Sequence, residues 1–128
     1  VDYFKLYNDH YGHQAGDACL SRLAALFKGC ARRPTDLVAR YGGEEFVCLL
    51  PETAATDAQM LAERIRQGVS SMALPNELAS PPHLTLSIGV ATLLGGKADA
   101  AQLLAQADEQ LYAAKHAGRD RVHAVVLR

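Results

Sequence analysis

Arg40-Tyr41-Gly42-Gly43-Glu44-Glu45-Phe46 sets two glycines and two acids between the apolar segments 37–39 and 46–50. Segments of strand length on both sides of adjacent glycines favour a β-hairpin with a tight turn. Glycine suits such a turn because it accepts positive φ, and its bare backbone lets a bulky ligand lie close. The sequence therefore predicts a hairpin whose tip carries Glu44 and Glu45.

The two neighbouring acids of this tip have two interpretations. Adjacent carboxylates repel each other and any anionic substrate, so by themselves they weaken the structure. A hard divalent cation reverses this, because Mg²⁺ takes oxygen ligands, keeps some water and commonly completes its shell with substrate phosphates. The pair indicates either a solvated acidic turn, which is common on protein surfaces, or a site for nucleotide phosphates.

The polar residues near the start of the chain also have ordinary structural explanations. Asn8, with Gly12 just beyond it, is typical of a helix end followed by a turn. Asp17 suits the N-cap of the next helix. His10 and His13 have a spacing compatible with a shared metal, but without a third ligand they are better interpreted as surface or turn residues.

Two pairs of charged residues lie beside predicted turns. Arg33 and Asp36 flank a turn at a spacing that allows a solvated ion pair. Lys115 and Arg119 lie four residues apart around the end of a predicted helix, where positive charge is favourable. Neither pair requires a ligand to explain it.

Composition narrows the class of protein. The chain has 128 residues, of which 49% are apolar and 21% charged, as expected for one soluble domain with a real core. A net charge of -1 argues against a nucleic-acid polymer as partner. We find no apolar run long enough to span a bilayer and no signal-peptide pattern. Cys19, Cys30 and Cys48 lie in apolar segments without paired spacing, so we expect core residues in a reducing compartment.

Hydrophobic periodicity supplies the remaining elements. The residues between 84 and 90 alternate apolar with small side chains, which predicts a strand with one apolar face. Gly118 is expected at the C′ position of the helix before it. The fold class predicted is α+β, with a mostly antiparallel central sheet covered by helices. The expected helices are a short one ending near residue 8, then residues 17–30, 54–72 and 100–117; the expected strands are the hairpin, 84–90 and 122–127.

Four blocks of the sequence match one known family in the same order. They are Asp2, Phe4-Lys5, Asn8-Asp9, Gly12-His13 and Gly16-Asp17; residues 33–46; residues 84–91; and residues 107–120. Together they resemble the GGDEF family, the diguanylate cyclases, in the Glu-containing variant of its hairpin. The resemblance covers nearly the whole chain and implies the palm architecture of nucleotide cyclases and polymerases.

The resemblance implies an activity. GGDEF enzymes condense two GTP molecules into cyclic di-GMP, a bacterial second messenger, and release two pyrophosphates with the help of Mg²⁺ or Mn²⁺. A ribose 3′-hydroxyl attacks the α-phosphate of the other nucleotide. Because each domain offers half an active site, two domains must meet as a homodimer.

The resemblance also implies roles for individual residues. The metal ligands and catalytic acids are Glu44 and Glu45, with the backbone carbonyl of Val1 as a further ligand. Asn8 and Asp17 face the guanine edge, and Lys115 and Arg119 contact the β- and γ-phosphates. Arg33 and Asp36 form an inhibitory site for the product. Further substrate contacts are implied for Phe4, Lys5, Gly42 and Gly43.

The resemblance further implies that Val1-Asp2 ends the family's first strand, whose first metal-binding Asp would lie just before Val1. Residues 1–128 are then a GGDEF domain without its first helix and most of its first strand, and these residues alone are expected to be inactive. An upstream sensory or dimerising region is implied, with a cytoplasmic location or a tether to a membrane sensor.

Two other functional classes remain. A binding module could keep Arg33 and Asp36 as a cyclic di-GMP receptor without turnover. A purely regulatory domain could bind GTP or a partner without chemistry. The intact segment Gly42–Phe46 favours the enzyme over both.

Overall fold

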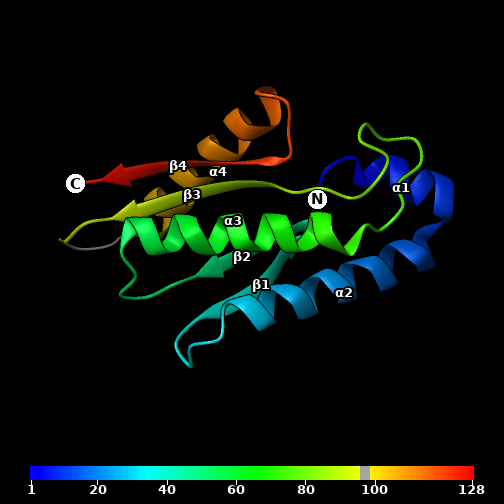
Figure 1. Cartoon of the computed structure of the whole chain (residues 1–128). Helices are drawn as coiled ribbons and strands as arrows, with labels where there is room; N and C mark the ends of the chain where they lie inside the picture. The colour runs from blue at the N-terminus through cyan, green and yellow to red at the C-terminus, as the bar shows by residue number, and fades with distance from the viewer. Residues whose placement is uncertain (96–98) are drawn as a thin grey trace.

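Helices and strands are distributed along the part of the chain that the computed structural model describes, residues 1–95 and 99–128 (Figure 1). The order mixes both kinds of element, which agrees with an α+β domain. The elements are α1 (Phe4–Tyr11), α2 (His13–Cys30), β1 (Leu37–Gly42), β2 (Glu45–Leu49), α3 (Ala55–Met72), β3 (Ser87–Leu93), α4 (Ala100–His116) and β4 (Arg121–Leu127).

The strands form two separate pairs in the described residues. β1 and β2 are antiparallel, whereas β3 and β4 are parallel. The parallel pair follows from its connection, because parallel neighbours need a long crossover and α4 lies between β3 and β4. One antiparallel pair and one parallel pair do not confirm the mostly antiparallel central sheet that we expected.

The hairpin is confirmed. Leu37 lies opposite Leu49 at one end of the ladder, and Gly42 lies opposite Glu45 at the other, so Gly43 and Glu44 form a two-residue turn. Gly43 has a φ of 52°, a conformation that favours glycine. The register shifts between Arg40 and Gly42. The Arg40 Nε donates to the Gly43 carbonyl at 2.7 Å, which fastens the turn to its own strand.

The core lies between α2, α3 and the segment that leads into β3. Leu23, Val69 and Leu84 are completely buried. Phe46 of β2 meets Phe27 of α2 edge to face, with ring centroids 5.0 Å apart, so the hairpin is joined to the same core. The helices predicted from hydrophobic periodicity at residues 17–30 and 54–72 each bury apolar residues in this core. The core cluster consists of Phe4, Cys19, Leu20, Leu23, Phe27, Ile65, Val69, Leu84 and Leu86.

The start of α2 differs from the prediction. The helix begins at His13, so Asp17 lies inside it and is not its N-cap. Gly12 occupies the N-cap position with a φ of 92° and directly follows α1. A glycine in this conformation turns the chain from one helix into the next within one residue, and no polar side chain caps α2.

The strand expected at residues 84–90 begins only at Ser87. Leu84, Thr85 and Leu86 are all buried, so the small residue of this alternation is buried together with the apolar ones. Thr85 and Ser87 can be buried because their hydroxyls both donate to the buried carboxylate of Asp2.

The end of α4 agrees with the prediction. Gly118 has a φ of 120°, and the Arg119 N–H donates to the Ala114 carbonyl at 3.0 Å, as in a Schellman motif. Cys48, which we expected in the core, is exposed on β2, while Cys19 is buried. In the described residues no helix combines the length and apolar character needed to cross a membrane.

Candidate active site

The tip of the hairpin lies beside the first residues of the chain. Glu44 and Glu45 are both half-buried. The backbone nitrogen of Val1 donates to the Glu44 carbonyl at 3.3 Å, although 43 positions separate the two residues. The structure thus brings together the three residues for which the sequence analysis implied metal ligation.

A cleft of about 410 Å³ joins the hairpin to α4. Glu45 lines it from the first position of β2, and Lys115 lines it from the last turn of α4. An acid and a cation from distant parts of the sequence therefore face one space. A metal-bound phosphate chain needs this combination, because it carries several negative charges. The lining residues are Glu45, Asp108, Glu109, Leu111, Tyr112 and Lys115.

A second cleft, of about 240 Å³, lies between α2 and the hairpin. Asp17 lines it from α2, and Phe46 lines it from β2. Ser21, Lys28 and Arg40 add polar groups to the same cleft, and the sequence analysis did not single them out. The burial of Asp17 is slight, so its carboxylate stays available to a ligand.

Asn8 has an unsatisfied polar atom. Its side-chain Oδ1 is buried and has no hydrogen-bond partner among the described residues. This oxygen lies against Gly16, where a Cβ would approach it to 1.8 Å, so α1 and α2 meet closely only because Gly16 lacks a side chain. A buried acceptor without a partner is costly, and a ligand donor would relieve that cost.

Phe4 and Lys5 are placed differently from each other. Phe4 is 5% exposed, belongs to the core, and stacks on Tyr7 with ring centroids 5.6 Å apart. Lys5 is exposed on α1. The substrate contact implied for Phe4 stays a prediction, while its side chain serves the packing of α1.

Lys115 and Arg119 flank the end of α4. The guanidinium of Arg119 lies 4.8 Å from the centre of the Tyr3 ring, a cation–π contact. Lys115 is half-buried in the last helical turn. Their charges also suit the C-terminus of a helix, so a structural role and a phosphate-binding role are compatible.

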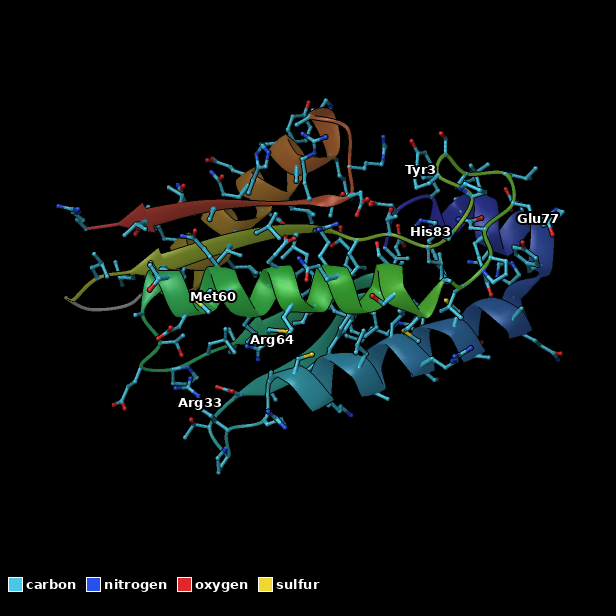
Figure 2. All side chains as sticks on the ribbon, viewed as in Figure 1. Tyr3, Arg33, Met60, Arg64, Glu77 and His83 are labelled. Carbon is cyan, nitrogen blue, oxygen red and sulfur yellow. The ribbon has the colours of Figure 1, made fainter. Side chains whose placement is uncertain are left out.

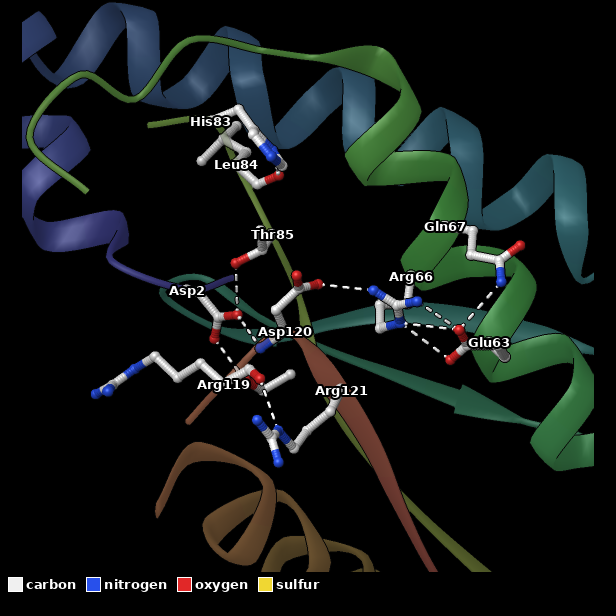
Figure 3. Close-up of polar contacts among 11 residues, drawn as sticks. Asp2, Glu63, Arg66, Gln67, His83, Leu84, Thr85, Arg119, Asp120 and Arg121 are labelled. Atoms are coloured by element: carbon white, nitrogen blue, oxygen red, sulfur yellow. Dashed lines mark hydrogen bonds and ion pairs between the residues drawn. The ribbon is translucent and has the colours of Figure 1, made fainter. Parts of the chain in front are cut away.

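Asp2 is a buried carboxylate whose contacts sequence reasoning missed. It is 3% exposed and accepts a hydrogen bond from the Thr85 hydroxyl at 2.8 Å (Figure 3). It accepts another from the Ser87 hydroxyl at 2.6 Å. A third donor is the Asp120 N–H at 3.1 Å. The signal for this role was the pair of small hydroxyl residues at alternate positions in an otherwise apolar segment.

Arg33 and Asp36 form an ion pair at the far end of β1 from the hairpin tip. The Arg33 Nη2 lies 2.9 Å from the Asp36 Oδ1, and it also contacts the Pro51 carbonyl at 2.7 Å and the Thr53 hydroxyl. The hydrogen bonds that Asp36 accepts from Arg33 hold the pKa of Asp36 below its ordinary value. The Arg33 side chain is 48% exposed. In Figure 2 Arg33 lies at the opposite end of the molecule from Tyr3.

The carboxylates at the tip fit a metal that the substrate helps to bind. Among the described residues no group of three or more His, Cys, Asp or Glu is suited to hold a metal ion. Mg²⁺, however, is commonly held by one or two carboxylates, with phosphate oxygens and water completing the octahedron. Glu44 and Glu45 supply that number of carboxylates.

The chain belongs to the GGDEF domain family. The family model described as diguanylate cyclase, GGDEF domain, matches residues 1–121. A curated relative, diguanylate cyclase A of Treponema denticola, is 41% identical over 122 residues, which are 95% of this chain and 32% of the relative. The chain thus spans about a third of the curated relatives' length.

Two solved structures are similar to this one. The GGDEF domain of DgcB from Caulobacter crescentus, in complex with c-di-GMP, has a TM-score of 0.82 and 36% identity, covering 97% of this chain and 72% of that one. The active GGEEF domain of a diguanylate cyclase from Vibrio cholerae has a TM-score of 0.80 and 35% identity, covering 97% and 77%. The Gly-Gly-Glu-Glu-Phe sequence of that domain is also the sequence of residues 42–46 here.

Proposed function

We propose that this domain is a diguanylate cyclase, which condenses two GTP molecules into cyclic di-GMP and two pyrophosphates. In each of two equivalent steps a ribose 3′-hydroxyl attacks the α-phosphorus of the other nucleotide. A new phosphorus–oxygen bond forms, the bond to the β-phosphate oxygen breaks, and pyrophosphate leaves with its electron pair while the hydroxyl loses its proton.

One observation carries this proposal. Glu45 of the hairpin and Lys115 of α4 line the same cleft, with Glu44 and the backbone of Val1 beside it. Acids that can hold a metal and a cation that can hold phosphate are the groups that phosphoryl transfer needs, because its catalysis is mostly positioning and charge stabilisation. A solvated acidic turn would not require a cation across a cleft.

The residues divide the work by their chemistry. Glu44, Glu45 and the Val1 carbonyl would hold Mg²⁺ or Mn²⁺, which when bound lowers the pKa of the attacking hydroxyl and neutralises phosphate charge. Lys115 and Arg119 bind the β- and γ-phosphates and so stabilise the leaving pyrophosphate. Gly42 and Gly43 give the nucleotide access to the backbone, because a Cβ at either position would meet open space.

Asn8 and Asp17 recognise the base in this proposal. Guanine presents N–H donors on its Watson–Crick edge, and the carboxylate of Asp17 can accept from them. Asn8 would supply the second polar group, although here its Oδ1 is buried against Gly16 and Asn8 does not line the cleft that Asp17 lines. Adenine offers a different pattern of donors and would leave these oxygens unpaired, which is how polar sites reject a wrong substrate. Lys5 adds an exposed cation on α1, the helix that also carries Asn8.

The reaction requires two domains. Each domain binds one GTP, and the 3′-hydroxyl of each nucleotide must reach the α-phosphate of the other. A homodimer that places two hairpin tips face to face satisfies this requirement by two-fold symmetry.

Arg33 and Asp36 form the proposed product site. A guanidinium that is half exposed can bind phosphate or the acceptor edge of guanine. Asp36, whose side chain is 4% exposed, holds that guanidinium and would be the acceptor for guanine nitrogens. Because the pair lies at the other end of β1 from Glu44, bound product would act at a distance from the chemistry.

A second candidate is a domain that binds cyclic di-GMP or GTP without turnover. The observation that favours it is the Arg33–Asp36 pair, which is intact, together with the DgcB domain that was solved in complex with c-di-GMP. The cleft shared by Glu45 and Lys115 favours the enzyme, because a receptor that uses only the distant pair has no need of it.

Glu45→Gln separates the enzyme from this alternative. The substitution keeps the size of a half-buried side chain at the tip, so we expect an unchanged circular dichroism spectrum and loss of at least about 99% of cyclic di-GMP synthesis from GTP with Mg²⁺. Glu52→Gln is the matched control, because Glu52 is an exposed acid beyond the far end of β2, and it should retain activity. Equal activity of both variants would remove Glu45 from the mechanism.

A further inference from the structure

The turn between α4 and β4 is strained. In the described part of the chain, five non-glycine residues have a positive φ, and three of them, Tyr3, Arg119 and Asp120, belong to two segments that touch. Their φ values are 54°, 62° and 47°. Left-handed conformations cost free energy for residues with a Cβ, and they persist where the surroundings fix them.

Two contacts hold Asp120. Its N–H donates to the buried Asp2 carboxylate at 3.1 Å, and its own Oδ1 lies 2.8 Å from the Arg66 Nη1 (Figure 3). Asp2 is itself fixed by the hydroxyls of Thr85 and Ser87. The turn is therefore tied both to the segment before β3 and to α3.

Arg66 is held in place independently of Asp120. The Glu63 carboxylate, one turn earlier on α3, accepts from the Arg66 Nε at 3.0 Å and 3.1 Å. The Arg66 side chain is only 20% exposed. A guanidinium fixed in this way presents its Nη1 to Asp120 as a preorganised anchor.

Arg119 precedes Asp120 and makes two contacts of its own. Its N–H donates to the Ala114 carbonyl at the end of α4, and its guanidinium lies over the Tyr3 ring. Asp2 holds the backbone of Asp120, the next residue, and Arg66 holds the Asp120 side chain. The guanidinium therefore leaves a rigid turn, close to the N-terminal segment that also contacts the hairpin tip.

We propose that Asp120 is a positioning residue, which holds Arg119 where it binds the nucleotide phosphates. Its N–H bond to Asp2 and its ion pair with Arg66 stabilise the strained turn before substrate arrives. The inference rests on the proposed function, because it requires Arg119 to contact GTP. Preorganisation of this kind lowers the cost of binding, since the side chain need not be ordered by the ligand.

The test measures binding of guanosine 5′-[α,β-methylene]triphosphate with Mg²⁺ by titration calorimetry, in the protein that carries this domain. In this analogue a methylene replaces the oxygen whose bond the reaction would break, so binding is measured without turnover. Asp120→Ala removes the ion pair and disfavours the left-handed conformation. We expect its dissociation constant to rise about three- to tenfold. Asp120→Asn should recover most of the affinity, because Asn tolerates positive φ and keeps an oxygen for Arg66.

Two further variants make the result specific. Glu63→Gln is the comparison variant, since it weakens the other partner of Arg66 and leaves the direct contact with Asp120. It should weaken binding of the analogue much less than Asp120→Ala does. In an Arg119→Ala background, Asp120→Ala should cause no further loss, because the two residues act as one unit.

The outcomes are distinguishable. If Asp120→Ala weakens binding equally with and without Arg119, or does not weaken it at all, Asp120 does not act through Arg119 and the inference is wrong. If Arg119→Ala itself leaves binding unchanged, the phosphate-binding role in the proposed function fails, and the inference fails with it.

Discussion

Gly89 of β3 offers a sharp test of how α4 is placed. A Cβ at Gly89 would lie 2.2 Å from the Ala107 carbonyl oxygen and 2.4 Å from the Leu111 nitrogen. Both atoms belong to the backbone of α4, so no side chain can rotate away. Ordinary Cβ contacts begin at 3.4 Å, and Gly89→Ala must therefore push the helix away from the strand by about 1 Å. Overpacking typically costs 1–3 kcal/mol, and for a clash with backbone we expect about 3 kcal/mol.

This cost should be visible in thermal unfolding and in activity. For a domain of this size, about 3 kcal/mol lowers Tm by about 10 °C. The same shift moves Lys115, because α4 carries it, so GTP binding should weaken as well. Gly29→Ala is the matched control. It lies in α2, and its Cβ would meet nothing within 4 Å, so the substitution should stabilise the domain by about 0.5–1 kcal/mol.

A loss below about 1 kcal/mol for Gly89→Ala would refute the reasoning. It would mean that α4 does not rest directly on the β3 backbone. If Gly29→Ala destabilised the domain by the same amount, the loss would not depend on the contact between Gly89 and α4.

Three further predictions follow. Arg33→Ala should weaken cyclic di-GMP binding about tenfold or more and leave the initial rate without product unchanged, and equal affinity in calorimetry would end the product-site assignment. Hydrogen bonds from Arg66 hold the pKa of Glu63 below its ordinary 4.5, so this pair stabilises the fold above about pH 4.5 and loses its effect as the pH falls through the lower, folded pKa. The difference in Tm between the unchanged protein and Glu63→Gln should therefore shrink as the pH falls below about 4.5, and a gap that stays constant through that range contradicts this origin. Activity per domain should rise with protein concentration in the micromolar range, and a constant value would argue against paired half-sites.

Local signals predicted the elements that depend on local physics. The glycine pair at residues 42–43 located the hairpin, because only a tight turn fits between two segments of strand length. The periodic apolar residues of α3 predicted a helix whose observed bounds are Ala55–Met72, with Ile65 and Val69 buried as expected. Gly118 likewise marked the end of α4, since the C′ position favours a residue without a Cβ.

Contacts between distant residues were not predictable in this way. Asp2 binds Thr85 and Ser87 across more than 80 positions, and nothing within either segment announces the other. The sequence therefore indicated those hydroxyls only as the small residues of a strand, and their contact with a buried carboxylate was not predicted. Asp17 illustrates the reverse case, because it has the chemistry of an N-cap, but a conformation at Gly12 started the helix four residues earlier.

In the candidate site, too, the sequence indicated single residues but not the contacts between distant ones. The sequence singled out Glu45 and Lys115 separately, the first from its turn and the second from its helix end. Only the fold brings them to one cleft. Lys28 and Arg40 line the cleft that contains Asp17, and no spacing in the sequence connects these three residues.

The most direct measurement supplies the protein that carries this domain with GTP and Mg²⁺ and identifies the products by mass and chromatography. We predict cyclic di-GMP and pyrophosphate in a ratio of one to two, with no cyclic product from ATP. Binding of cyclic di-GMP without any synthesis from GTP would contradict the proposed cyclase activity, and it would identify the domain as a receptor.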